Sequence, residues 1–442
     1  MDAPTERMPF IHYDEAKRAA SDVARRWVEQ DPRIERLLLV ADLFGKLRLA
    51  VWGPVAVLDE RRADFDRQLA KGSGAWWTGE MLAVNDTGDT DRQLWETAWN
   101  EGRRDGGAER LRILARHRTR TAWFVDVAEP PWKAPEGGPP IVVFYSFKGG
   151  LGRSTTLASF AIQRARAGDR VCVVDFDLDA PGIGRLLAAD DKGAASPWGV
   201  VDFLVECGQG ELPLADYHHS CGRVAGAGQI TVFPAGKLDA NYSDKLARID
   251  LEERPAARGS ALTRLLEGIR TEVAPRWILL DARTGVSEPA GQLLSGIAHL
   301  HVLFGTTSEQ SWQGLSTVVD RLGRQRILDG RSQAEVVLVQ AMVPRSTEAA
   351  RRAEEAFATR AQGVFTDLYY AEAPDDPTDE GFWDVRDLES EDAPHAPVTL
   401  AYDEKLADIR DIADVADPLC ETKEYVTLAA RIATRFEKEA DE

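Results

Sequence analysis

A short stretch of the sequence combines three glycines, two cations and two hydroxyl side chains. It consists of Lys148, Gly149, Gly150, Leu151, Gly152, Arg153, Ser154 and Thr155. Glycines at this density allow successive backbone N–H groups to turn toward one anion. A helix that begins near Arg153 would point the positive end of its dipole at the same place. The two hydroxyl groups suit a magnesium ion and a phosphate oxygen, so we predict a phosphate-binding loop.

The elements on either side of this loop are the ones needed to position it. Residues 141–144 form an apolar run whose composition is typical of a buried strand. Leu157, Phe160 and Ala161 then begin the spacing of an amphipathic helix. Strand, glycine loop and helix, in this order, are the context that a phosphate-binding loop requires. The alternative is a glycine-rich turn between strand and helix that binds no ligand.

The loop differs at two positions from the common pattern G-x-x-x-x-G-K-[ST]. Phe147 stands at the first glycine position, and Arg153 stands at the lysine position. The stretch resembles the deviant Walker A loop KGGxGK[ST] of the MinD/ParA family of P-loop ATPases, which belongs to the SIMIBI class. In that loop the first position is free and an extra lysine precedes the glycine pair, so only Arg153 departs from it. The resemblance covers residues 141–343 well and the remainder loosely, and it implies ATP and Mg²⁺ as ligands.

Acidic residues follow the next apolar run, residues 170–175. Asp175 and Asp177 stand at the carboxyl end of this expected strand, where ligands of open α/β sheets bind. They resemble the D-x-D of the family's switch I segment, which implies that Asp177 orients the attacking water and that Asp175 is structural. Asp179 has no assigned role. The alternative is that these acids cap a helix near Pro181.

Two later strands end in residues that the same resemblance assigns to the site. Residues 276–281 form a hydrophobic strand that ends in Asp281, in the manner of a Walker B element, so Asp281 and Ser154 are the expected magnesium ligands. Gly285 follows at the place where a switch II glycine lies near the terminal phosphate. Residues 335–340 resemble the family's strand that ends in an adenine-reading asparagine, which implies that Gln340 reads the base.

The resemblance also implies a mechanism. In the family two subunits face each other across ATP, so Lys148 would reach the partner's phosphates and act with Asp177 in catalysis. Arg153 would cradle the β- and γ-phosphates, and because a guanidinium is planar and bidentate, we expect binding to persist and turnover to be slow.

We therefore expect an ATPase that switches state with its nucleotide, forms a homodimer around ATP and signals to an unidentified protein partner. Two alternatives remain open. One is a binding module that senses ATP with little or no hydrolysis. The other is a regulatory component of a bacterial defence or signalling system.

Composition narrows the class of protein. A net charge of −19 argues against a surface built to hold nucleic acid. The basic segment 321–331 is read as a solvated helix end, with a local DNA contact as the alternative. Four scattered cysteines suggest free thiols. No apolar run approaches the roughly 20 residues of a membrane span, and the amino terminus lacks signal-peptide features, so we expect a cytoplasmic protein without an integral membrane segment.

The 442 residues predict two or three domains. No family resemblance is identified for residues 1–135. Residues 1–127 are expected to form a small α+β domain of unknown role. Residues 128–140 contain five prolines and are expected to be a linker. Residues 141–442 are expected to form an α/β domain of the P-loop NTPase, MinD/ParA-like class, with a mostly parallel sheet and helices on both faces.

Local patterns predict further elements in both regions. In the first domain they predict a helix at 14–30, a hairpin of strands 34–44 and 47–52, helices at 60–70, 91–103 and 109–116, and a strand at 121–127. In the second domain they predict strands at 299–304, 364–370 and 397–400 and helices from 402 and over 424–438. The acidic, proline-interrupted segment 372–392 is expected to be a mobile loop.

Overall fold

The computed structural model describes residues 11–105, 108–116, 121–123, 129–190, 195–207, 212–249, 260–328, 331–372 and 383–437. The chain divides into two compact units, Met1–Thr119 and Arg120–Glu442. The sequence predicts the end of the first domain near residue 127. The role of each domain stays a prediction.

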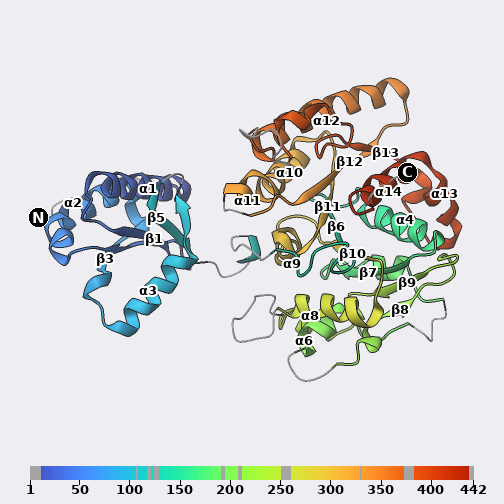
Figure 1. Cartoon of the computed structure of the whole chain (residues 1–442), viewed down its shortest axis with the longest axis horizontal. Coiled ribbons are helices and arrows are strands. Elements are labelled where there is room, and N and C mark those ends of the chain that lie inside the picture. The colour runs from blue at the N-terminus through green and yellow to red at the C-terminus, as the bar shows by residue number, and fades with distance from the viewer. Residues whose placement is uncertain are drawn as a thin grey trace, which may run out of the picture. The chain divides into compact units, whose positions relative to one another are not determined.

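The first unit is a small α+β structure, as predicted. Its elements are α1 Tyr13–Gln30, β1 Arg36–Ala41, β2 Leu47–Trp52, α2 Val55–Ser73, β3 Trp77–Ala83, α3 Asp89–Glu101, β4 Arg103–Asp105 and β5 Ala108–Ala115. The strands pair in the order β3-β2-β1-β5-β4, and β1 and β2 form the predicted antiparallel hairpin. Helices α1 and α2 cover one face of the sheet and α3 covers the other (Figure 1).

The helix predicted at residues 109–116 is wrong, because these residues form strand β5. It pairs in parallel with β1 and antiparallel with β4. Leu111 and Leu114 are buried. The segment is rich in residues that favour helices, but pairing on both sides outweighs a propensity worth less than about 1 kcal/mol per residue.

The second unit is built on an eight-stranded sheet. Its strands are β6 Ile141–Ser146, β7 Arg170–Phe176, β8 His219–Ser220, β9 Gln229–Phe233, β10 Trp277–Ala282, β11 Leu300–Gly305, β12 Glu335–Val343 and β13 Val398–Ala401. They lie in the order β13-β12-β11-β6-β10-β7-β9-β8. Neighbours are parallel except for β8 and β9. Strand β6 therefore lies in the middle of the sheet, with β10 and β11 beside it.

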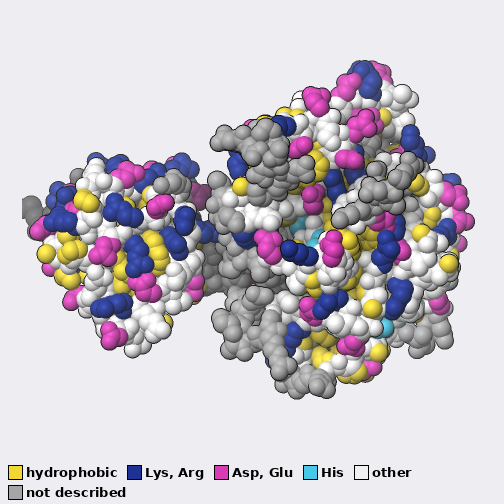
Figure 2. Space-filling view, viewed as in Figure 1, with side chains coloured by type: hydrophobic (Ala, Val, Ile, Leu, Met, Phe, Trp, Pro, Cys, Tyr) yellow, Lys and Arg dark blue, Asp and Glu magenta, His cyan; other side chains and the backbone are white. Residues whose placement is uncertain are grey.

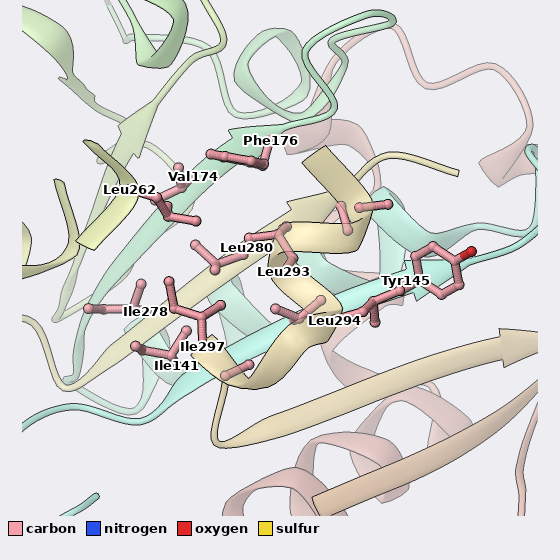
Figure 3. Close-up of a cluster of buried hydrophobic side chains, with 14 of the residues drawn as sticks. Ile141, Tyr145, Val174, Phe176, Leu262, Ile278, Leu280, Leu293, Leu294 and Ile297 are labelled. Atoms are coloured by element: carbon pink, nitrogen blue, oxygen red, sulfur yellow. The ribbon is translucent and has the colours of Figure 1, made fainter. Parts of the chain in front are cut away.

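Helices cover both faces of this sheet, which confirms the predicted fold class. One face carries α4 Arg153–Arg166, α5 Ile183–Leu186, α13 Ala416–Glu421 and α14 Lys423–Thr434. The other carries α6 Val200–Glu206, α7 Tyr242–Leu246, α8 Ala261–Gly268, α9 Glu288–Gln292, α10 Glu309–Leu322 and α12 Thr347–Leu368. The short helix α11, Arg324–Leu328, follows α10 and contacts it. Figure 3 shows Leu262, Leu293 and Ile297 packed on strand residues of this second face. The strands are buried on both faces, which explains their continuous apolar runs.

A short segment that precedes β6 is docked on the second face. Residues Thr121–Trp123 form a 3-10 turn, so the strand predicted at 121–127 is wrong for its described part; residues 124–127 lie outside the described residues. Ala122 donates its N–H to Glu288, and the Trp123 indole donates to the Ser287 carbonyl. Arg321 of α10 donates to the carbonyls of Ala122 and Trp123.

Four further predictions in the second unit need correction. The strand predicted at 364–370 is mostly the last part of α12, which buries Phe357, Ala361 and Phe365 at helical spacing. Residues 373–382 of the predicted loop lie outside the described residues, but Trp383 donates to Glu335 and a 3-10 turn, Val385–Glu389, follows it. The helix predicted from 402 is a 3-10 turn, Glu404–Leu406, and the closing helix ends at Thr434.

The basic segment 321–331 is not a solvated helix end. Besides Arg321, Arg324 donates to the carbonyls of Thr366 and Tyr370, and Arg326 is buried and donates to the Ser332 carbonyl. These guanidinium groups therefore bind backbone of their own unit. On the face drawn in Figure 2, cationic and anionic side chains are interspersed.

Candidate functional site

The glycine-rich loop joins β6 to α4 as predicted. Gly150 and Gly152 have φ angles of +75° and +77°, which favour glycine. A Cβ atom at Gly149, Gly150 or Gly152 would meet no heavy atom within 4 Å. The space over the loop is therefore open. Helix α4 begins at Arg153 without a side-chain cap, so its first N–H groups remain available to an anion.

Phe147, which stands at the first glycine position of the common pattern, packs away from the loop. A Cβ atom on Gly314 of α10 would lie 2.0 Å from the Phe147 ring, so the ring rests directly on that glycine. The aromatic side chain thus anchors the start of the loop to α10. The position tolerates a large residue because its side chain does not enter the space over the glycines.

Arg153 bridges two acids at the carboxyl ends of neighbouring strands. Its Nε donates to Asp281 Oδ1 at 2.6 Å, and its Nη2 donates to Asp177 Oδ2 at 3.0 Å. Ser154 Oγ donates to the other oxygen of Asp281, at 2.6 Å. Strands β6, β10 and β7 are adjacent, and this adjacency brings the loop and both acids together.

The cluster is almost fully removed from solvent. The side chains of Arg153, Asp177 and Asp281 are 8%, 10% and 1% exposed. Burial alone would lower the pKa of the Arg153 guanidinium, but the charges of Asp281 and Asp177 raise it above its ordinary value. Arg153 is therefore a fixed cation between the acids. Its third nitrogen, Nη1, is buried and has no hydrogen-bond partner within the described residues.

Asp175 orders the backbone of the acidic segment. Its carboxylate accepts the N–H groups of Asp177, Gly182 and Gly184. Burial and the neighbouring charge of Asp281 raise the pKa of Asp175 to about 8. Asp175 thus fixes the turn that presents Asp177.

Arg283 is a second arginine beside the acids, and no motif in the sequence singles it out. Its Nη1 lies 2.6 Å from Asp179 and 3.9 Å from Asp177. Asp179, which had no expected role, therefore holds the arginine that follows Asp281 by two residues. Acids at 177, 179 and 281 and a cation at 283 are the only sequence signal that could have suggested the pairing of Arg283 with Asp179.

Gly285 lies close to the start of the loop. It has a φ angle of +68°, and a Cβ atom there would lie 3.9 Å from the Phe147 carbonyl oxygen. The Tyr145 hydroxyl donates to the Gly285 carbonyl at 3.2 Å. The segment after β10 is thus attached to the strand that leads into the loop.

Lys148 and Gln340 differ in their availability. Lys148 is partly exposed, and no hydrogen bond or ion pair holds it within the part of the chain that the structure describes. Gln340 is buried, and its Nε2 donates to the Ala353 carbonyl at 2.9 Å. Its side-chain oxygen is buried without a hydrogen-bond partner. The structure therefore places Gln340 in the strand's packing against α12.

A cavity of about 290 Å³ adjoins the loop on the side of β12 and β13. It is lined by Gly150, Leu151, Gly152, Thr155, Thr156, Met342, Leu400, Ala401, Tyr402, Asp403, Leu406, Ala407 and Tyr425. Met342 has a φ of +61° and lies where the pairing of β12 with β13 shifts register. The sequence did not predict that Met342 and residues 400–407 line a cavity beside the loop. The one available signal was the expected strand at 397–400, whose carboxyl end reaches the same edge of the sheet. A groove of about 870 Å³ between α10 and α12 has no loop residue in its lining.

The oxygen ligands at the loop suit a hard divalent cation. Asp281 and Ser154 are in contact, and Mg²⁺ commonly takes one or two protein oxygens and completes its shell with phosphate oxygens and water. Among the described residues, no group of three or more His, Cys, Asp or Glu side chains could hold a metal ion by itself. The described cysteines are free thiols. Of the described helices, none combines the length and apolar character needed to span a bilayer.

Comparison with known proteins gives local and distant similarities. No protein-family model matches the chain. The chain is 40% identical over 74 residues to a cytosolic Fe-S cluster assembly factor NUBP2 homologue of Trichoplax adhaerens. That match spans 17% of this chain and 24% of the relative, so it covers about a quarter of the relative's length.

Among solved structures, pNOB8 ParA bound to nonspecific DNA is 14% identical, with a TM-score of 0.42, and covers 67% of this chain and 99% of its own. The cell division ATPase MinD of Pyrococcus furiosus is 20% identical, with a TM-score of 0.39 and the same coverage. MinD of Pyrococcus horikoshii complexed with Mg-ADP is 18% identical, with a TM-score of 0.39, and covers 68% and 100%. The chain is therefore similar to the NUBP2 homologue over one segment and to these structures at low sequence identity.

Proposed function

We propose that the second unit binds ATP with Mg²⁺ at the glycine-rich loop, hydrolyses it slowly and changes state with its nucleotide. The observation that carries this proposal is the contact of Arg153 with Asp177 and Asp281 at the first turn of α4. An open glycine loop, a helix N-terminus and two buried acids then meet at one edge of the sheet. Phosphoryl transfer depends mainly on such positioning and charge.

Each residue of the loop has a role in this proposal. The N–H groups of Gly149–Gly152 and of the first turn of α4 would bind the phosphate oxygens. Ser154 and Asp281 would hold Mg²⁺, which supplies charge neutralisation to the phosphates when bound. Asp177 would orient the attacking water, and Asp175 would keep Asp177 in place through the turn that it orders.

The cavity beside the loop is the site that we propose for the nucleoside. It shares Gly150, Gly152 and Thr155 with the phosphate loop, so a ligand bound by its phosphates there would have its other end near Met342 and Tyr402. Its volume is near the lower end of ordinary small-molecule sites. Gln340 remains a candidate for reading the base only if its bond to Ala353 opens.

We further propose that Lys148 contacts the phosphates of a second subunit, so that ATP stabilises a homodimer. Its partly exposed ammonium group without a described partner supports this role. The protein partner would be reached through the first unit. In support, Ala122 and Trp123 of the segment before β6 bind Glu288 and Ser287, which lie three and two residues beyond Gly285.

An ATP sensor with little turnover is the second candidate, and Arg153 favours it. The guanidinium is hydrogen-bonded both to Asp177, the acid expected to orient the water, and to Asp281, the expected metal ligand. A nucleotide could therefore bind while the groups needed for hydrolysis stay engaged with each other.

Two measurements made together test these proposals. ATP hydrolysis and molar mass in solution are measured with and without ATP for the wild type, Lys148→Ala and Asp177→Ala. The expected wild type hydrolyses ATP slowly and doubles its mass with ATP, whereas Lys148→Ala stays monomeric. Mass doubling without turnover supports the sensor. A wild type that neither binds ATP nor changes mass contradicts the proposed function.

A further inference from the structure

We propose that the Arg153 guanidinium takes the place of a divalent cation between Asp177 and Asp281. On this proposal the phosphates of a nucleotide can bind before any metal ion does, and Arg153 must leave Asp281 before Mg²⁺ can join Ser154 and Asp281 for hydrolysis. The inference rests on the proposed function, because it concerns the same nucleotide site.

The first argument is that both oxygens of Asp281 are already used. One accepts from Arg153 Nε and the other from Ser154 Oγ, each at 2.6 Å. Asp281 and Ser154 are the two protein groups that would otherwise bind Mg²⁺. A metal ion therefore competes with a short, charge-assisted hydrogen bond to Asp281, whose side chain is only 1% exposed.

The second argument concerns charge. Two buried carboxylates repel each other and need a cation between them. Arg153 supplies that charge permanently, since a guanidinium stays protonated in proteins. The negative charge of the two acids is thus already compensated before any metal ion binds. Arg283 adds a second positive charge at its edge, 3.9 Å from Asp177.

The third argument is geometric and distinguishes arginine from lysine. The planar guanidinium uses Nε for one acid and Nη2 for the other, and it keeps Nη1 as a buried donor with no hydrogen-bond partner in the described residues. A buried donor left unpaired costs about 1–3 kcal/mol. A phosphate oxygen would satisfy it while both acids stay bound. A lysine ammonium is a point charge and lacks this fixed fork of donors.

The test measures ADP affinity in excess MgCl₂ and in excess EDTA by calorimetry. For the wild type, removal of the metal is expected to change the dissociation constant by less than about threefold. For Arg153→Lys, it is expected to weaken binding by about tenfold or more. Arg164→Lys is the matched control, because Arg164 lies on the same helix and pairs with Asp169 and Glu437 outside the site. This control should behave as the wild type.

The outcomes separate the inference from the function. Wild-type binding that weakens tenfold or more in EDTA overturns the inference and leaves the proposed function standing. Metal-independent binding by Arg153→Lys also overturns the inference. A wild type that binds ADP in neither buffer overturns both.

A second measurement needs no nucleotide. Mn²⁺ binding is followed by electron paramagnetic resonance for the wild type, Arg153→Met and the double variant Arg153→Met/Asp281→Asn, with circular dichroism as a check on folding. We expect Arg153→Met to bind Mn²⁺ about tenfold more tightly than the wild type, and the double variant to lose this gain. Equal Mn²⁺ affinity of the wild type and a folded Arg153→Met contradicts the inference. If Arg153→Met does not fold, the Arg153→Lys comparison decides.

Discussion

The Trp123 indole donates its Nε1 hydrogen to the Ser287 carbonyl at 2.5 Å. The indole also lies directly against Gly291 of α9, where a Cβ atom would be 2.6 Å from its ring. Ser287 is two residues beyond Gly285, and Gly285 lies beside the phosphate loop. The segment 121–123, which precedes β6, is thus hydrogen-bonded to and packed against the residues that follow Gly285, the expected switch II glycine.

Removal of this attachment should destabilise the second unit. Trp123→Ala removes a buried indole and its hydrogen bond, so we expect the free energy of unfolding to fall by about 3 kcal/mol. Urea unfolding of the full chain measures it. Trp198→Ala is the control, because Trp198 is 45% exposed and its loss should change stability by less than about 0.5 kcal/mol. Equal effects of the two substitutions would contradict the docked role of Trp123.

Gly314→Ala should distort the phosphate loop from a distance. The new methyl group would overlap the Phe147 ring at 2.0 Å, so the ring and the start of the loop must shift. We expect ADP binding to weaken by about tenfold. The double variant Gly314→Ala/Phe147→Ala should recover most of this loss, because the overlap is gone. Gly363→Ala on α12 is the control, since a Cβ there meets no atom within 4 Å.

Asp177→Asn should separate hydrolysis from binding. The substitution keeps the size of the side chain but removes the charge proposed to orient the attacking water, so we expect turnover to fall by about 100-fold with ADP affinity little changed. Asp179→Asn is the matched control, because Asp179 is exposed and pairs with Arg283 instead of Arg153. Single-turnover hydrolysis measures both. Equal losses in the two variants would remove the assignment of Asp177.

His301 should make the stability of the second unit depend on pH. It is fully buried on β11, and burial followed by the charge of Arg326 lowers its pKa to about 4. The unfolded chain holds this proton more tightly, with a pKa of about 6.5. The free energy of unfolding should therefore fall as the pH drops below about 6.5 and level off near 4, with about 2 kcal/mol lost by pH 5.

Urea unfolding near pH 7.5 and pH 5 measures this loss for the wild type and His301→Gln. The variant cannot take up the proton, so its loss between the two pH values should be smaller by about 2 kcal/mol. The same loss in both proteins would show that His301 does not carry the effect.

Much of the second unit could be predicted from the sequence because its signals are local. Residues 141–144 and 277–280 are continuous apolar runs, and each lies in a buried parallel strand. The glycines of the loop and the helix that begins at Arg153 are also where the sequence predicts them. Two of the wrong predictions, residues 109–116 and 364–370, are short segments in which strand and helix patterns compete. Pairing with β1 and packing of α12 decided them.

The sequence by itself determined the chemistry of the loop and the strand ends on which Asp177 and Asp281 stand. Only the tertiary structure decided that Arg153 holds both acids, that Gln340 packs against α12, and that Met342 and Tyr402 form a wall beside the loop. The physical reason is that local sequence sets the conformation of a loop or strand. Which charges and side chains meet is set by strand order, and the adjacency of β6, β10 and β7 joins residues more than 100 positions apart.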